Sequence, residues 1–175
     1  DRYDAAVFFG RDAEIVHGLD VLRGMRTKGI ESMLVIQGPS GAGKSAFLRA
    51  GLLPRLYKDD RRFLPMEVVR PERDVLTGER GLAKSIEKLY ACLGVEGPVL
   101  GDIKEACKKR DTARLWGWLD AARQTARTRL LDPDPKEPAP TLVLPLDQAE
   151  ELFSASTNEA GSFLKIVADL LARRD

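Results

Sequence analysis

Apolar residues recur at helical spacing near the start of the chain. Over residues 12–28 they fall three or four positions apart, at Ile15, Leu19 and Leu22, with Val16 and Met25 beside them. This period predicts an amphipathic helix with Asp12 as its N-cap. Gly29 follows directly and can close the helix in the left-handed conformation.

The same spacing predicts helices in the middle of the chain. Residues 81–93 present one apolar face, and a longer stripe follows Asp111, which we expect to cap a helix running to about Leu130. A short helix is expected over residues 103–107, and the helix that follows residues 38–45 is expected to end near Leu53, before Pro54. The arginines of the longer helix and the basic run 108–110 are interpreted as a solvated face, since stacking aromatic residues do not interleave with them.

Three short apolar runs instead have the character of strands. They cover residues 33–37, 63–70 and 141–146, and each is followed by glycine, proline or an acidic residue. Strands that alternate with helices predict an α/β fold with a parallel sheet flanked by helices. Pro145 cannot donate a ladder hydrogen bond, so it predicts an edge, a bulge or a local break in the third strand.

Composition limits the class of protein. The chain has 175 residues, 43% of them apolar, which suffices for one α/β domain with a hydrophobic core. A net charge of +1 gives no global attraction to nucleic acid or membranes. The two cysteines lack metal-type spacing, and neither a membrane-spanning run nor a signal peptide is seen. We therefore expect reduced thiols and a cytoplasmic location.

Residues 38–45 carry the most specific chemistry of the sequence. They read GPSGAGKS, which matches the phosphate-binding pattern G-x-x-x-x-G-K-[ST] between a strand-type and a helix-type segment. Glycines let the backbone approach a ligand, and amides at a helix N-terminus favour phosphate. The alternative is a glycine-rich turn that binds no ligand. It would require the flanking strand-type and helix-type segments to be coincidental. We expect ATP or ADP to contact Gly38, Pro39, Ser40, Gly41, Ala42, Gly43, Lys44, Ser45 and Ala46, with Lys44 on the β- and γ-phosphates and Ser45 on Mg²⁺.

A second acidic element follows about a hundred residues later. The apolar run 141–146 ends in Asp147, and Glu150 and Glu151 come shortly after. An acid at the carboxyl end of a strand beside the phosphate loop can hold Mg²⁺, and a following glutamate can activate water. Alone, the pattern equally fits a strand that runs into an acidic helix cap. With the loop upstream we expect Asp147 at the metal site, holding Mg²⁺ through water, and Glu150, or else Glu151, as the catalytic base.

These segments together resemble a known family. FFGRDAEIVHGLDVLR, MLVIQGPSGAGKSAFLRAGLLPRL, the VVRP step and LVLPLDQAEELF look like the nucleotide-binding domain of bacterial STAND NTPases, signal-transduction ATPases with numerous domains. The resemblance runs from Phe8 to the final helix. It is weakest over residues 96–140, which we interpret as a possible helical insert in a domain covering residues 1–175.

The resemblance implies an ATP-dependent signalling switch. In such proteins ADP holds a closed monomer, and ATP with an activating signal permits homo-oligomerisation, which gathers attached effector domains. C-terminal sensor repeats supply the signal, and bacterial relatives include regulators and antiviral defence proteins. Gly10 and Arg11 would lie near the adenine and ribose. ATP over GTP rests on this resemblance.

The resemblance also implies a particular order of strands. In this additional-strand class of NTPases, one further strand follows the strand that ends at Asp147. It lies in the sheet between that strand and the strand that precedes the phosphate-binding loop. The sequence stops in the helix after Asp147. We therefore expect an incomplete core in a segment of a longer polypeptide, unless the two strands pair directly.

The sequence is also compatible with two other functions. One is a scaffold that holds nucleotide without hydrolysing it. The other is a phosphotransferase of the nucleotide- or small-molecule-kinase type, for which Arg123, Arg127 and Arg129 would form a lid. Their helical spacing spreads these arginines over a surface, which disfavours the lid.

Overall fold

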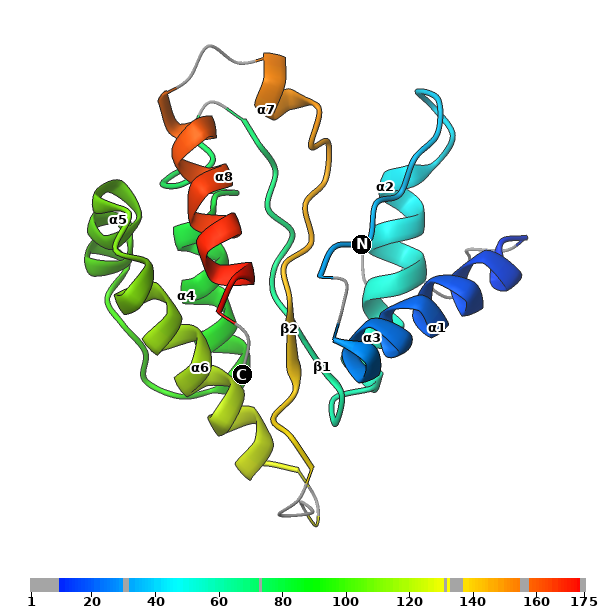
Figure 1. Cartoon of the computed structure of the whole chain (residues 1–175), viewed down its shortest axis with the longest axis horizontal. Coiled ribbons are helices and arrows are strands. Elements are labelled where there is room, and N and C mark those ends of the chain that lie inside the picture. Colours follow the sequence, from blue (N-terminus) through cyan, green and yellow to red (C-terminus); the bar gives the residue numbers. More distant parts are fainter. Residues whose placement is uncertain are drawn as a thin grey trace.

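The computed structural model describes residues 10–29, 32–72, 74–130, 132, 137–154 and 158–173. In this part of the chain, helices flank a short parallel sheet on both sides (Figure 1). The elements are α1 (Asp12–Lys28), α2 (Lys44–Ala46), the π-helix η2 (Phe47–Leu52), α3 (Leu53–Lys58), β1 (Phe63–Pro65), α4 (Leu82–Leu93), α5 (Leu100–Lys109), α6 (Thr112–Thr128), β2 (Thr141–Val143), α7 (Glu151–Ser154) and α8 (Asn158–Leu171). This mixed architecture is compatible with the α/β NTPase-like fold that the sequence predicts.

The sheet pairs β1 with β2 in parallel. Phe63 lies opposite Thr141 and Pro65 opposite Val143, and an isolated parallel bridge joins Val69 to Leu146 farther along. The ladder is interrupted at Pro145, whose carbonyl still accepts from the Val69 amide at 2.9 Å. The expected local break at this proline is therefore confirmed. β1 and β2 are both shorter than the apolar runs 63–70 and 141–146 in which they lie.

The strand expected over residues 33–37 is not formed. This segment has no strand assignment, and the side chains of Met33 and Val35 are 71% and 57% exposed. Within the described residues the segment is not hydrogen-bonded to β2 as a neighbouring strand. An apolar run becomes a strand only where a partner backbone satisfies its amides and carbonyls, and here none of the described strands lies beside it.

The helix after the glycine loop continues farther than expected. The sequence predicted an end near Leu53, but α3 runs through Pro54 to Lys58. Pro54 lacks an amide hydrogen, and the preceding turns are π-helical, with the Leu53 amide bonded to the Leu48 carbonyl. The Arg55 guanidinium donates to the Gly51 carbonyl at 2.8 Å. The side chain thus satisfies a backbone carbonyl in the altered helix.

Two apolar clusters hold the helices against the two faces of the sheet. One joins α1, η2 and α3 to β1 and is centred on Ile15, Leu56 and Phe63. The other is larger and joins α4, α5, α6 and α8 to the segment 66–76. No helix within the described ranges has both the length and the apolar character required to cross a bilayer.

Residues 96–140 take part in the larger cluster. Ile103 of α5 and Leu115 of α6 are fully buried there. Trp116 and Trp118 are both half-buried, and Trp118 packs against this cluster. Arg123 is also not a solvated residue, because its side chain is 11% exposed and donates to the Pro140 carbonyl at 3.0 Å.

Several local signals in the sequence are confirmed. Gly29 ends α1 in the left-handed conformation, and the Asp111 side chain accepts from the Arg114 amide at the start of α6. The predicted N-cap of α1 is displaced by one residue, since Arg11 occupies that position and Asp12 begins the helix. Val16 is 55% exposed and lies outside the core face of α1.

The two thiols differ in burial, which predicts different reactivity. Burial raises the pKa of the Cys107 thiol to about 12, whereas Cys92 is exposed. Because the thiolate is the reactive form, we expect N-ethylmaleimide at pH 8 to label Cys92 at least about 100-fold faster than Cys107 in the native chain. Peptide mapping by mass spectrometry measures both rates, and denaturant should equalise them. Fast labelling of Cys107 under native conditions would contradict its burial.

Candidate functional site

The glycine loop (residues 38–45) forms an exposed turn that leads into a helix. Gly41 and Gly43 have φ angles of 79° and 75°, a region that disfavours residues with a Cβ. The Ala42 amide bonds to the Pro39 carbonyl at 3.2 Å, and helix α2 begins at Lys44. The loop therefore places a sharp turn of backbone ahead of a helix N-terminus, as the pattern predicted.

The Lys44 side chain folds back onto this loop. Its amine donates to the carbonyls of Gly38 and Pro39 at 2.8 and 3.0 Å. The charge of Lys44 thus lies against the loop backbone, at the end of the site where the sequence places the phosphates. These two backbone carbonyls hold the amine in place.

Ser45 meets Asp147 across 102 residues of sequence. The Ser45 hydroxyl donates to Asp147 Oδ1 at 2.8 Å, and Asp147 is 8% exposed. The position of Asp147 is fixed by the extended ladder, because its amide donates to the Val69 carbonyl at 3.0 Å. The structure thus brings together the two residues that the sequence separately predicted as metal ligands.

Arg49 is a third member of this cluster that the sequence reasoning did not assign to the site. Its Nε and Nη2 atoms lie 3.1 and 3.0 Å from Asp147 Oδ2. Ser45 and Arg49 are four residues apart in the sequence, so a helical turn places both on one face. That spacing was the available signal, but the direction of the face depends on tertiary packing.

The donor set suits Mg²⁺ shared with a phosphate. Mg²⁺ takes oxygen ligands and usually keeps several of its waters. Ser45 Oγ and Asp147 Oδ1 lie 2.8 Å apart, so a hydroxyl that could bind the ion lies beside a carboxylate that could hold its water. Within the described residues, no group of three or more acidic, histidine or cysteine side chains could hold a metal alone. Phosphate and water would therefore supply the other ligands.

Arg11 lies against the glycine loop as well. Its Nη1 donates to the Ala42 carbonyl at 3.1 Å, and its guanidinium packs over the Phe47 ring at 5.1 Å. Its Nε also pairs with Glu14. Gly10 precedes it with a φ of 94°, while Phe8 and Phe9 lie outside the described residues. Arg11 thus lies against the glycine loop, and the base-and-sugar role that the resemblance implies for Gly10 and Arg11 stays a prediction.

The two candidate bases follow Asp147 in a constrained turn. Gln148 adopts a φ of 60°, unusual for a residue with a Cβ, and α7 starts at Glu151. The Glu151 carboxylate lies 3.6 Å from Arg70 Nη2, at the end of the neighbouring strand segment. Glu150 is exposed. The structure therefore gives the two glutamates different surroundings.

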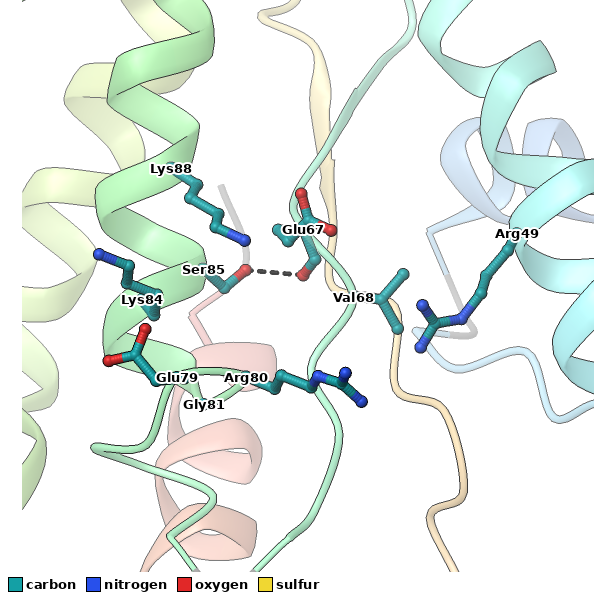
Figure 2. Close-up of a pocket in the computed structure, with 9 residues that line it drawn as sticks. All are labelled: Arg49, Glu67, Val68, Glu79, Arg80, Gly81, Lys84, Ser85 and Lys88. Atoms are coloured by element: carbon teal, nitrogen blue, oxygen red, sulfur yellow. Dashed lines mark hydrogen bonds between the residues drawn. The ribbon is translucent and has the colours of Figure 1, made fainter. Parts of the chain in front are cut away.

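A cavity of about 120 Å³ lies beside Arg49 (Figure 2). It is lined by Arg49 and Val68 on one side and by the start of α4, including Lys84 and Ser85, on the other. Figure 2 shows Arg49 reaching toward Val68 from its helix. The glycine loop does not line this cavity, so the phosphate end of the site lies elsewhere.

Arg123, one of the arginines considered as a lid, is not at this site. Arg123 donates to the Pro140 carbonyl, at the amino end of β2, whereas Asp147 follows its carboxyl end. An arginine at the amino end of the strand cannot close over a phosphate at the other end. This placement disfavours the phosphotransferase alternative.

Comparison with known proteins identifies the family. The model of the family described as Novel STAND NTPase 1 matches residues 1–175. The chain belongs to this family. No curated protein and no solved structure gives a significant match. The resemblance seen in the sequence is confirmed, and the family name implies an NTPase-type signalling domain that uses a nucleotide and a divalent metal.

The loop geometry of this STAND NTPase predicts a sharp difference between two glycines. Gly43→Ala forces a Cβ into the left-handed region and should lower the free energy of unfolding by about 1–2 kcal/mol. Because the same turn aims the loop backbone, we expect binding of a fluorescent nucleotide to weaken at least about tenfold. Denaturant unfolding and fluorescence titration measure the two effects.

Gly117→Ala is the matched control. Gly117 lies within α6, and a Cβ there would meet no atom within 4 Å. Alanine in a helix interior is favoured over glycine by about 0.5–1 kcal/mol, so this variant should be more stable and bind nucleotide normally. Equal nucleotide affinities for the two variants would contradict the assigned role of the loop turn.

Proposed function

We propose that this STAND NTPase binds ATP or ADP with Mg²⁺, hydrolyses ATP slowly and acts as a nucleotide-dependent signalling switch. The observation that carries the proposal is the 2.8 Å contact between Ser45 of the glycine loop and Asp147 at the end of the strand. A specific loop motif and a weaker acidic signal, far apart in the chain, meet in the way that a phosphate-and-metal site requires. Family membership supports the same conclusion.

Each part of the site has a distinct task in this proposal. The backbone of residues 38–46 surrounds the phosphates, and Lys44 exchanges its two loop carbonyls for the β- and γ-phosphates. Ser45 and Asp147 hold Mg²⁺, which offsets the charge that develops on the phosphates. Gly10 and Arg11 lie beside the adenine and ribose. Residues 1–175 act as one nucleotide-binding domain.

Glu150 is the preferred base of the two glutamates. The Glu151 carboxylate lies 3.6 Å from Arg70 Nη2, which ties it to the neighbouring strand segment. Glu150 is exposed to solvent next to the turn that follows Asp147, and we assign it the role of orienting and deprotonating the attacking water.

The switch acts through assembly. In the proposed cycle, ADP keeps the protein monomeric, and ATP with an activating signal permits homo-oligomers that gather effector domains in the cytoplasm. Sensor repeats and an effector elsewhere in the polypeptide would link the cycle to regulation or antiviral defence. These partners are proposals from the family resemblance.

Substitution of one glutamate at a time tests which of the two is the catalytic base. Glu150→Gln should bind ATP with affinity near the parent's and turn it over at least about tenfold more slowly, because the amide cannot accept the proton. Glu151→Gln is the matched control and should retain most of the activity. Phosphate release and fluorescent-nucleotide titration give rate and affinity. If Glu151→Gln alone loses turnover, the two roles are exchanged.

Light scattering of the polypeptide at its native length tests the switch. We expect the solution mass to rise with a non-hydrolysable ATP analogue and Mg²⁺ but to stay monomeric with ADP. Lys44→Ala should abolish the rise, because the lysine is the main positive charge on the terminal phosphates. A constant mass with firmly retained ADP and absent turnover, even after activation, would favour a nucleotide-stabilised scaffold.

A further inference from the structure

The Asp147 carboxylate is shared between two side chains of one helical face. Ser45 donates to Oδ1 at 2.8 Å, and Arg49 places Nε and Nη2 at 3.1 and 3.0 Å from Oδ2. The two oxygens therefore have separate partners. Arg49 does not occupy the oxygen that faces the Ser45 hydroxyl.

Burial makes a counter-charge necessary at this position. The Asp147 side chain is 9% exposed, and a carboxylate so withdrawn from water is costly without a positive partner. Among the described residues, Arg49 is the cation that forms an ion pair with Asp147. The Lys44 amine is instead turned onto the carbonyls of Gly38 and Pro39.

The Arg49 side chain pairs with Asp147 beside a small cavity. Its guanidinium passes beside Val68, with the small cavity beyond (Figure 2). Three further cations, Arg80, Lys84 and Lys88, line that cavity against two acidic residues. Arg80 and Lys84 are paired with Glu72 and Glu87, so the contact of Arg49 with Asp147 Oδ2 is the ion pair that holds its guanidinium.

We propose that Arg49 is the resident counter-ion of Asp147 and lets the site take nucleotide without Mg²⁺. Arg49 holds Oδ2 and keeps Oδ1 turned toward Ser45, so both metal ligands stay in position between metal-bound states. The inference rests on the proposed nucleotide site. It makes Arg49 a positioning residue and predicts that ADP binding depends only weakly on Mg²⁺.

Titration with a fluorescent ADP derivative in Mg²⁺ and then in EDTA tests this dependence at native polypeptide length. For the parent we expect EDTA to weaken binding by less than about tenfold. Arg49→Gln leaves Asp147 without its counter-charge, and the ratio of the two dissociation constants should rise at least about tenfold over the parent's. Arg49→Lys should lie between them, since it keeps the charge but not the planar fork.

Arg62→Gln is the matched control. Arg62 is 53% exposed and pairs with Asp59, so its loss should leave the Mg²⁺ dependence unchanged. Equal ratios for the parent and Arg49→Gln overturn the proposal. Tighter Mg²⁺-dependent binding in Arg49→Gln with an unchanged EDTA value also overturns it, because Arg49 would then compete with the metal.

Hydrogen exchange of the nucleotide-free protein separates this inference from the proposed function. Arg49→Gln should speed amide exchange at least about fivefold in peptides covering residues 141–148, where the Asp147 amide bonds to Val69. In an Asp147→Asn background the same change should have less than about a twofold effect. An unaltered exchange rate, or an equal effect in both backgrounds, overturns the counter-ion role. If the parent binds no ADP with or without Mg²⁺, the proposed function and the Mg²⁺-independent binding both fail, and exchange alone decides whether Arg49 holds Asp147.

Discussion

The buried carboxylate of Asp147 is the constraint around which the two sides of this STAND NTPase are arranged. It follows the strand segment that pairs with residues 63–69, and it reaches the helix that leaves the glycine loop. A charge with 9% exposure cannot be left without partners. The helix must therefore present a hydroxyl and a guanidinium at this point, and Ser45 and Arg49 supply them from one face.

Apolar packing determines how accurately that face is presented. The cluster around Ile15, Leu56 and Phe63 attaches the helices that flank the loop to β1. At the opposite end of β2, Arg26 donates to the carbonyls of Pro138 and Ala139 and to the Thr141 hydroxyl at 3.1, 3.2 and 2.7 Å. The site is thus positioned by contacts at both ends of the sheet. Removing apolar volume beneath the helix would move Ser45 relative to Asp147 without altering either residue.

Features set by neighbouring residues in the sequence were predictable, and those set by distant partners were not. Gly29 and the turns at Gly41 and Gly43 act through their own backbone, and the Asp111 side chain caps its helix through an amide only three residues away, so the sequence predicts them well. The segment 33–37 has strand composition but acquires no strand in the described chain, because a ladder needs a partner that composition does not supply. Pro54 appeared to end a helix, but π-helical turns and the Arg55 side chain allow the helix to continue.

The same division applies to the candidate site. Lys44 and Ser45 were predicted because their motif has few alternative explanations, and Asp147 was predicted because that motif lies upstream of it. The contact of Arg49 with Asp147 depends on the rotation of a π-helix over the sheet, and that of Arg70 with Glu151 depends on strand register. Helical spacing restricts such contacts to a few candidates, and only tertiary structure selects among them.

The parallel pairing of β1 with β2 also has a consequence for synthesis on the ribosome. Phe63 emerges well before Thr141, and the chain between them contains the complete helices α4, α5 and α6. Those helices contact one another locally and can associate while β1 still lacks its strand partner. Until the later strand is translated, β1 exposes an unpaired edge, and the glycine loop lacks the carboxylate that completes its site. The nascent chain therefore contains its most recognisable motif for some time before the fold can make use of it.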